Sequence, residues 1–172
     1  PVIIFPESFD ARTLQAALRL VRYANLVLLA NEEELLRYAA EHCPQIPKYR
    51  LQFLFKSAKL VDISRETELV GLFAKAYKET QSLSQTVKLE ISAEQFVTTP
   101  VGFALMAVKL GYADVVVGGL QNGPREFIRP ALNFLKGKND PYEAGFFMLP
   151  EGSRDSIFPN NIAIFADIGV TI

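Results

Sequence analysis

The chain has 172 residues, of which 49% are hydrophobic and 22% charged, and its formal net charge is −1. This composition excludes an intrinsically disordered chain. The near-zero charge gives no reason to expect nucleic acid or an anionic membrane as a partner, although a small anion needs only a local site. We expect one globular domain, or one domain and part of a second.

The single cysteine, Cys43, follows the single histidine, His42. A single cysteine cannot form an intramolecular disulfide. The two residues also fall short of the roughly four ligands of a structural zinc site, so we expect no metal. Neighbours on a helix point about 100° apart, which favours a buried thiol and a helix-end histidine over a nucleophilic pair. No apolar run approaches the ~20 residues of a membrane span. No signal peptide is evident, so we expect the cytoplasm.

Short apolar runs alternate with helix-like segments in the first part of the chain. The expected elements are a strand at Val2–Phe5, a helix capped by Asp10, a strand at Leu26–Ala30, a helix from Asn31 to about Cys43, a loop at Gln45–Arg50 and a strand at Ala58–Ile63. Next come a helix at Glu66–Lys78, a surface loop or mobile segment at Gln81–Glu90, a helix at Gly102–Leu110, a strand at Val115–Val117 and a helix from Pro124 to about Leu135, with Ile91–Thr99 ambiguous. This alternation predicts an open parallel sheet with crossover helices.

The pattern changes after Lys136. Two apolar strands, Ala144–Leu149 and Ile162–Asp167, follow each other without a helix between them. They predict a hairpin or the start of a second domain, so we expect one α/β domain at residues 1–136 and a truncated one at 137–172. The chain ends within the apolar run Gly169–Ile172, which we interpret as truncation because a last strand there would leave an open edge.

The best candidate site runs from Val115 to Arg129. A buried strand leads into Gly118 and Gly119, then a loop, then the expected helix start, where free N–H groups and the helix dipole attract anions. Ligands of open parallel sheets bind beyond the carboxyl ends of the strands. The predicted phosphate-binding residues are Arg129, Gly118, Gly119, Asn122, Gly123 and Arg125. A plain strand-to-helix turn with solvated arginines is the alternative.

Two further residues, Glu7 and Ser8, close the first strand at the same edge of the sheet and are predicted to line the site. Arg125 and Arg129 are four residues apart, so a helix from Pro124 would place them on one face, where either could pair with a phosphate.

Several segments resemble the phosphate acetyltransferase and phosphate butyryltransferase family. They are Ile4–Leu14 with Ala16 and Ala17, Leu28–Asn31 with Glu33 and Glu34, Phe103–Ala104, Met106–Gly111, Ala113–Asp114, Ile128–Leu132, Gly145–Leu149 and Ile164–Asp167. The Val-Lys-Leu-Gly stretch and the Arg-Pro-Ala-Leu helix are the specific parts. Together the matches run across nearly the whole chain.

The resemblance implies an open three-layer α/β fold, isocitrate/isopropylmalate dehydrogenase-like as in phosphotransacetylases, with two domains, a cleft between them and often a homodimer. It implies acyl transfer between coenzyme A and phosphate, with acetyl-CoA, phosphate or acetyl phosphate as partners and coenzyme A as a substrate, not a bound cofactor. Arg129 would hold the phosphate group, with residues 119–123 beside it.

The chain also departs from the family pattern. The loop Gln121–Phe127 lacks the histidine and hydroxyl residues that the family usually carries there, and Ser8 replaces a glycine. The family's basic stretch before the helix at Gly102–Leu110 is reduced to Lys78. The family extends well beyond this length, and its acidic base is expected beyond Ile172, so no catalytic residue is assigned. Three hypotheses remain: an acyltransferase or its N-terminal part, a non-catalytic binder of a phosphate or acyl ligand, and an interaction domain.

Overall fold

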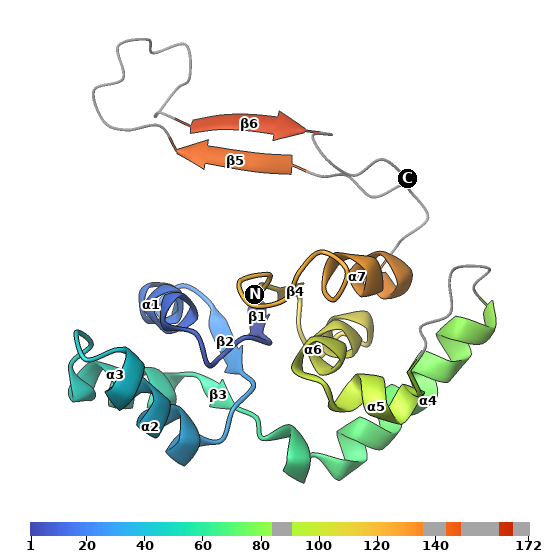
Figure 1. Ribbon diagram of the computed structural model, residues 1–172, viewed down its shortest axis with the longest axis horizontal. Helices are drawn as coiled ribbons and strands as arrows, with labels where there is room; N and C mark the ends of the chain where they lie inside the picture. The colour runs from blue at the N-terminus through green and yellow to red at the C-terminus, as the bar shows by residue number, and fades with distance from the viewer. Residues whose placement is uncertain (84–90, 136–143, 149–161, 167–172) are drawn as a thin grey trace. The chain divides into compact units, whose positions relative to one another are not determined.

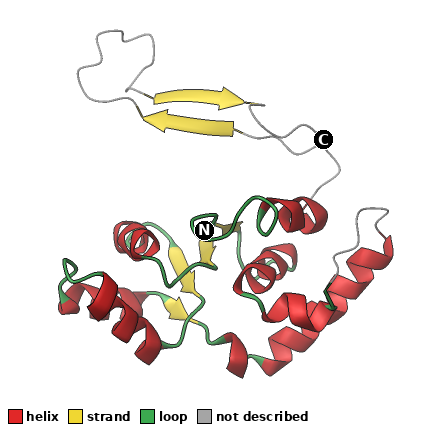
Figure 2. Ribbon diagram, in the orientation of Figure 1, coloured by secondary structure: helices red, strands yellow, loops and turns green. Residues whose placement is uncertain are grey.

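The computed structural model describes residues 1–83, 91–135, 144–148 and 162–166 (Figures 1 and 2). The chain divides into two compact units, residues 1–135 and residues 136–172. This division lies one residue from the boundary predicted from the sequence. That the second unit begins a further domain stays a prediction.

The first unit contains a parallel sheet with the strand order β3-β2-β1-β4. The strands are β1 (Val2–Phe5), β2 (Asn25–Leu28), β3 (Lys59–Leu60) and β4 (Val115–Val116). In the central strand, Ile4 pairs with Val27 on one side and Val116 on the other. Successive strand side chains point to opposite faces, so Ile4 and Phe5 are both buried, but in different cores. The predicted parallel sheet is confirmed.

Helices cover both faces of this sheet (Figure 1). One face carries α1 (Ala11–Leu20), α2 (Glu32–His42) and α3 (Lys48–Ser57). The other carries α4 (Thr67–Leu83), α5 (Ala93–Thr98), α6 (Pro100–Lys109) and α7 (Ile128–Leu135). Each layer packs through its own hydrophobic core, one around Leu14, Leu35 and Leu54 and one around Phe73 and Leu105. The three-layer α/β class is therefore confirmed; the dehydrogenase-like description stays a prediction.

The helix α3 is absent from the sequence prediction, which placed a loop at Gln45–Arg50. It begins directly after Pro47 and buries Leu51, Leu54 and Phe55. These three residues have the i, i+3, i+4 spacing of one helix face, which is the signal that identifies the helix. The predicted loop is wrong beyond Pro47 because this apolar face needs a core to pack against.

The segment that the sequence left ambiguous forms α5, which packs directly before α6. Ser92 and Gln95 cap α5 reciprocally, each side chain accepting the other residue's N–H. Thr99 ends α5 and caps α6, where Pro100 is the first helical residue. The predicted loop at 81–90 is wrong for residues 81–83, which extend α4; residues 84–90 lie outside the described part.

The second unit contains an antiparallel hairpin of β5 (Ala144–Met148) and β6 (Ile162–Ala166). Phe146 pairs with Ile164 at its centre. The predicted pair of strands is confirmed to within one residue at its ends. Leu149, Asp167 and the terminal run 169–172 lie outside the described residues.

Candidate functional site

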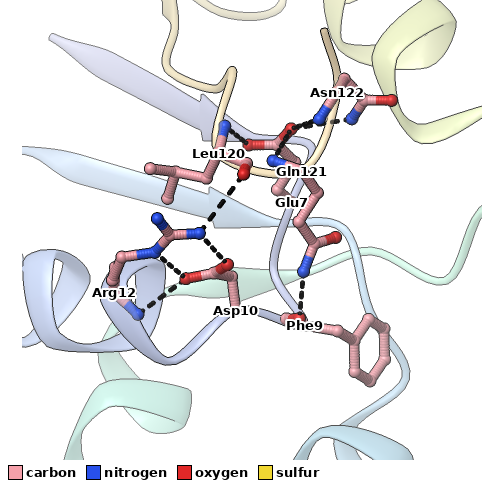
Figure 3. A network of polar contacts seen from close by, with 7 residues as sticks. All are labelled: Glu7, Phe9, Asp10, Arg12, Leu120, Gln121 and Asn122. Carbon is pink, nitrogen blue, oxygen red and sulfur yellow. Dashed lines mark hydrogen bonds and ion pairs between the residues drawn. The ribbon is translucent and has the colours of Figure 1, made fainter.

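The carboxyl ends of β1 and β4 lie side by side, because the two strands are parallel neighbours in the sheet. β1 leads into the segment Pro6–Arg12, and β4 leads into the loop of residues 117–123. Residues more than a hundred positions apart in the sequence therefore meet at one edge (Figure 3). This is the edge at which ligands bind in open parallel sheets.

The carboxylate of Glu7 occupies the loop after β4. One oxygen accepts the N–H of Leu120 at 2.7 Å. The other accepts the N–H of Gln121 at 2.9 Å and both the backbone N–H and the side-chain Nδ2 of Asn122 at 2.8 Å (Figure 3). The loop of residues 117–123 thus donates backbone N–H groups to an anion, and in this structure that anion is the chain's own Glu7.

Glu7 is 4% exposed, so an unpaired charge there would be costly. Burial raises the pKa of its carboxyl, but the hydrogen bonds from Leu120, Gln121 and Asn122 outweigh it, and the net pKa lies below the ordinary value. Glu7 is therefore ionised at neutral pH. Its low basicity and occupied oxygens make it a structural anchor for the loop.

The start of α1 holds the same loop from a second side. Arg12 donates from Nε and Nη2 to the two oxygens of Asp10, at 3.0 and 2.8 Å, and from Nη2 to the carbonyl of Leu120 at 3.3 Å. Gln121 donates from Nε2 to the carbonyl of Phe9 at 2.7 Å. Asp10 also caps α1 by accepting the N–H of Arg12, as predicted. The segment Pro6–Arg12 thus fixes both N–H and C=O groups of the loop.

The Arg12 guanidinium holds the pKa of Asp10 at about 2, against burial, which acts in the opposite direction. Asp10 is itself 7% exposed. The pair is a bidentate arginine–carboxylate contact, the geometry that gives ion pairs directional strength. Asp10 therefore remains charged down to strongly acidic pH.

Two adjacent glycines of the loop are required for different reasons, Gly118 by packing and Gly119 by its backbone conformation. A Cβ on Gly118 would lie 2.6 Å from the ring of Phe127 and 3.1 Å from Pro6. Gly119 has φ of +96°, a conformation that side chains other than glycine rarely adopt. The absence of a side chain at Gly118 therefore makes room for Phe127 and Pro6 of the protein itself.

The helix after the loop begins at Ile128, and the prediction of a start at Pro124 is wrong. Residues 124–127 form a turn instead. The N–H groups of Glu126 and Phe127 both bond to Gly123, and those of Ile128 and Arg129 both bond to Pro124. Two of these bonds span four residues as in an α-helix, but the bond of Glu126 spans three and that of Arg129 spans five, so no regular helix begins here.

Only Arg129 of the two predicted arginines is helical, so Arg125 and Arg129 do not share a helix face. Pro130 lies in the first turn of α7, where its missing N–H breaks no intrahelical bond. Both arginine side chains are exposed, and neither forms an ion pair within the described residues.

A cavity of about 560 Å³ opens beside this network. Its wall is mostly apolar and includes Ile91, Phe96, Pro100, Val101 and Pro130. Its polar residues are Glu7, Thr99, Gln121, Asn122, Arg125 and Glu126. The size and the mixture of an apolar wall with a few polar groups are typical of small-molecule sites. We call this space the strand-end cavity.

The strand-end cavity has one arginine and one helix N-terminus to attract an anion. Arg125 lines it, and α6 begins at it with Thr99 and Pro100. The Thr99 hydroxyl accepts the N–H of Gly102 at 3.0 Å. The positive end of the α6 dipole thus adds to the charge of Arg125. The ionised Glu7 carboxylate is held by the N–H donors of the loop, and Glu126 adds an exposed carboxylate to the wall.

The structure brings together some of the predicted site residues and separates others. Glu7, Asn122 and Arg125 line the strand-end cavity, whereas Gly118, Gly119, Gly123, Arg129 and Ser8 are not part of its wall. Ser8 is fully buried and donates its hydroxyl to the carbonyl of Phe5 at 2.9 Å. Sequence reasoning missed the contacts of Arg12 with the loop and the contribution of Thr99.

Cys43 and His42 lie away from this cavity. Cys43 is fully buried in the core under α2, and burial raises the pKa of its thiol. His42 is half exposed, and its ring lies 4.5 Å from that of Tyr38. The interpretation as a buried thiol and a helix-end histidine is confirmed. Among the described residues there is no cluster of three metal-ligating side chains and no helix long and apolar enough to cross a membrane.

Comparison with known proteins decides the family. The sequence model for phosphate acetyl/butaryl transferase matches residues 1–172. The chain belongs to this family. The resemblance inferred from the opening motif and the Arg-Pro-Ala-Leu helix is thereby confirmed.

Two curated members of the phosphate acetyl/butaryl transferase family illustrate the match. The phosphate acetyltransferase of Thermoanaerobacterium thermosaccharolyticum is 28% identical over 170 residues, which are 98% of this chain and 48% of that protein. The one from Acetivibrio thermocellus is 26% identical over 170 residues, 98% of this chain and 47% of its own length. The chain thus spans about half the length of these relatives.

Solved structures give the same fold. The EutD phosphotransacetylase from Staphylococcus aureus superposes with a TM-score of 0.71 at 22% identity, covering 99% of this chain and 46% of that one. A phosphotransacetylase from Streptococcus pyogenes gives 0.67 at 22% identity, covering 90% and 44%. At this identity the likeness establishes the α/β architecture.

Proposed function

We propose that this chain provides the phosphate side of an acyltransferase site, in a protein that exchanges an acyl group, acetyl or longer, between coenzyme A and inorganic phosphate. Membership of the phosphate acetyl/butaryl transferase family supports the reaction class. One structural observation carries the assignment of the site. The strand-end cavity joins Arg125, which forms no ion pair within the described residues, and the start of α6 to a largely apolar wall.

The chemistry needs a cation beside the phosphate. In the direction from acetyl phosphate, the thiolate of coenzyme A attacks the carbonyl carbon, and the carbon–oxygen bond to phosphate breaks. The phosphate leaves with the electron pair, so negative charge grows on its oxygens. Arginine stabilises that charge with charge-assisted hydrogen bonds. We assign this role to Arg125 from the cavity and to Arg129 from the family resemblance, with the apolar wall holding the acyl group.

The thiol proton must pass to a base when coenzyme A becomes a thiolate. Glu7 is unsuited to that task although it lines the cavity, because its pKa is lowered and its oxygens accept four hydrogen bonds. We propose that Glu7 keeps the loop in place and that Gly119 and Gly123 lie beside the phosphate through this loop. Coenzyme A acts as a substrate in this scheme.

The same network favours a second candidate, binding of a phosphate or acyl ligand without turnover. The N–H groups of Leu120, Gln121 and Asn122 would be natural donors to a bound phosphate, but they donate to Glu7. A site of this kind can bind an anion through Arg125. It stabilises the transition state of acyl transfer less than a site whose loop N–H groups are free to donate to the phosphate.

We also propose a homodimer in the cytoplasm. The dimer is supported by the resemblance to a family in which many members are dimers. The compartment is supported by the single cysteine, which is typical of proteins that do not depend on disulfides.

Acetyl phosphate formation from acetyl-CoA and phosphate tests the enzyme proposal, with calorimetric titration of acetyl phosphate as a parallel measurement. Substitution Arg125→Ala or Arg129→Ala should lower kcat/KM by about 10²–10³-fold, as removal of a donor to developing charge does. Arg37→Ala is the matched control, because Arg37 is exposed on α2 and outside the cavity wall. Arginine-dependent binding without turnover would support the second candidate. Neither binding nor turnover would contradict both.

A further inference from the structure

A second cavity lies between the end of α1 and the start of α3, two helices that contact each other in the same layer (Figure 1). Its volume is about 740 Å³. Its wall includes Arg19, Arg22, Tyr23, Tyr49, Arg50 and Phe53. We call it the arginine groove. It shares no residue with the strand-end cavity.

The arginine groove holds three positive charges that the described residues do not compensate. Within the described residues, Arg19, Arg22 and Arg50 form no ion pair, and the groove wall contains no acidic side chain. Arg12 and Arg65, by contrast, each pair with a nearby aspartate. Three uncompensated charges in one concave surface repel one another and attract an anion.

The helix dipoles favour the position of only one of these three arginines. Arg19 lies in the last turn of α1, where a cation favours the negative end of the helix dipole. Arg22 lies beyond that helix, and Arg50 lies in the first turn of α3, where a cation is disfavoured. No side chain caps the α3 N-terminus, so its positive end adds to the field of the arginines.

The aromatic residues of the groove are unusually open to solvent. Tyr23 is 81% exposed, Tyr49 70% and Phe53 48%. Tyr49 and Phe53 are four residues apart on α3 and thus lie on one face of the helix. None of the three takes part in a ring–ring contact within the described residues. Their rings are free to stack against a planar group.

We propose that the arginine groove binds a nucleotide, with the phosphates on Arg22 and Arg50 and the base against the exposed rings. A bare phosphate would use only the arginines, and an apolar ligand only the rings, whereas a nucleotide uses both. The volume falls in the range of about 300–1,000 Å³ typical of small-ligand sites. The formal net charge of −1 argues against an extended nucleic acid. This inference is independent of the proposed acyl transfer.

Calorimetric titration of the purified protein with ATP, adenosine and inorganic triphosphate tests the proposal. ATP should bind saturably and at least about tenfold more tightly than either fragment. The double variant Arg22→Ala/Arg50→Ala should weaken ATP binding by about tenfold or more, because each arginine contributes a charge-assisted contact. Arg37→Ala should leave it unchanged. Tyr49→Ala should weaken ATP binding, and Tyr49→Phe, which keeps the ring, should restore it.

The design separates the groove from the strand-end cavity. Arg125→Ala should leave ATP binding unchanged; loss of binding in Arg125→Ala but not in the Arg22/Arg50 double variant would place ATP in the strand-end cavity and overturn the proposal. Absence of saturable ATP binding, or equal affinities in the double variant and Arg37→Ala, would also overturn it, as would tighter binding of an oligonucleotide than of ATP. All substituted groove residues are exposed, and thermal unfolding by circular dichroism checks that each variant is folded.

Discussion

The carboxylate of Glu7 accepts the N–H of Gln121 at 2.9 Å, although the two residues are 114 positions apart in the sequence. This contact joins the end of β1 to the loop that follows β4. The loop's neighbours, Leu120 and Asn122, donate to the same carboxylate. The acidic residue of the opening motif therefore determines the shape of the loop beside the strand-end cavity.

Substitution Glu7→Gln should lower the free energy of unfolding by about 1–3 kcal/mol, because an amide offers one acceptor oxygen and turns an NH₂ group toward N–H donors. Urea unfolding measures the loss. Glu126→Gln is the control, since Glu126 is an exposed carboxylate of the same cavity and should change stability by no more than about 0.5 kcal/mol. Equal losses in the two variants would show that the Glu7 network does not stabilise the fold.

The Asp10–Arg12 pair predicts a specific pH dependence. Because the pKa of Asp10 is lowered from 3.8 to about 2 in the folded protein, its charge stabilises the fold above pH 3.8, and this contribution is lost as the pH falls toward 2. Asp10→Asn keeps an N-cap acceptor but cannot titrate. Between about pH 5 and pH 2 the wild type should lose on the order of 1 kcal/mol more than Asp10→Asn, a figure reduced for the exposure of Arg12. Parallel urea-unfolding profiles would contradict the assignment.

Two glycines should respond to alanine in opposite directions. Gly119→Ala should destabilise the protein by about 1–2 kcal/mol, because φ is +96° there. Gly71→Ala should stabilise it by about 0.5–1 kcal/mol, because Gly71 is exposed within α4 and a Cβ there meets nothing within 4 Å. Thermal unfolding of the two variants should therefore shift to opposite sides of the wild type. A stabilising Gly119→Ala would contradict the loop conformation.

The aromatic cluster behind the strand-end cavity should hold α7 in place. The ring of Phe134 lies 4.9 Å from that of Tyr77 and 5.2 Å from that of Phe96, and Phe134 is 1% exposed. Phe134→Ala should cost about 3–5 kcal/mol of unfolding free energy, measured by urea unfolding. Phe53→Ala, at a half-exposed position, should cost far less. A small effect at Phe134 would mean that α7 is not docked through this cluster.

The sheet and most helices could be predicted because their signals are local. Val2–Phe5 is apolar on both faces, and Asp10 and Asn31 stand where caps are needed. Leu51, Leu54 and Phe55 of α3 have helical spacing, but the prolines at 44 and 47 just before them are typical of a loop. The sequence therefore predicted a loop where α3 begins. The late start of α7 was missed because two prolines, at 124 and 130, both fit a first helical turn.

The site was predictable in its location but not in its contacts. The rule that ligands bind at the carboxyl ends of parallel strands correctly brings Glu7 and Asn122 to one edge. No local pattern shows that Glu7 fills the loop, because that depends on the neighbouring positions of β1 and β4 in the sheet. The place of Arg125 in the cavity wall, without Arg129, likewise depends on the turn at 124–127.

A two-dimensional ¹H–¹⁵N NMR titration with acetyl phosphate tests most directly that the strand-end cavity is the anion site. The account predicts that the backbone signals of Val101, Asn122 and Arg125 shift together and saturate at one ligand concentration. The same titration of Arg125→Ala should lose these shifts, and that of Arg37→Ala should keep them. Saturating shifts confined to residues outside the cavity wall, or none at all in the wild type, would contradict the account.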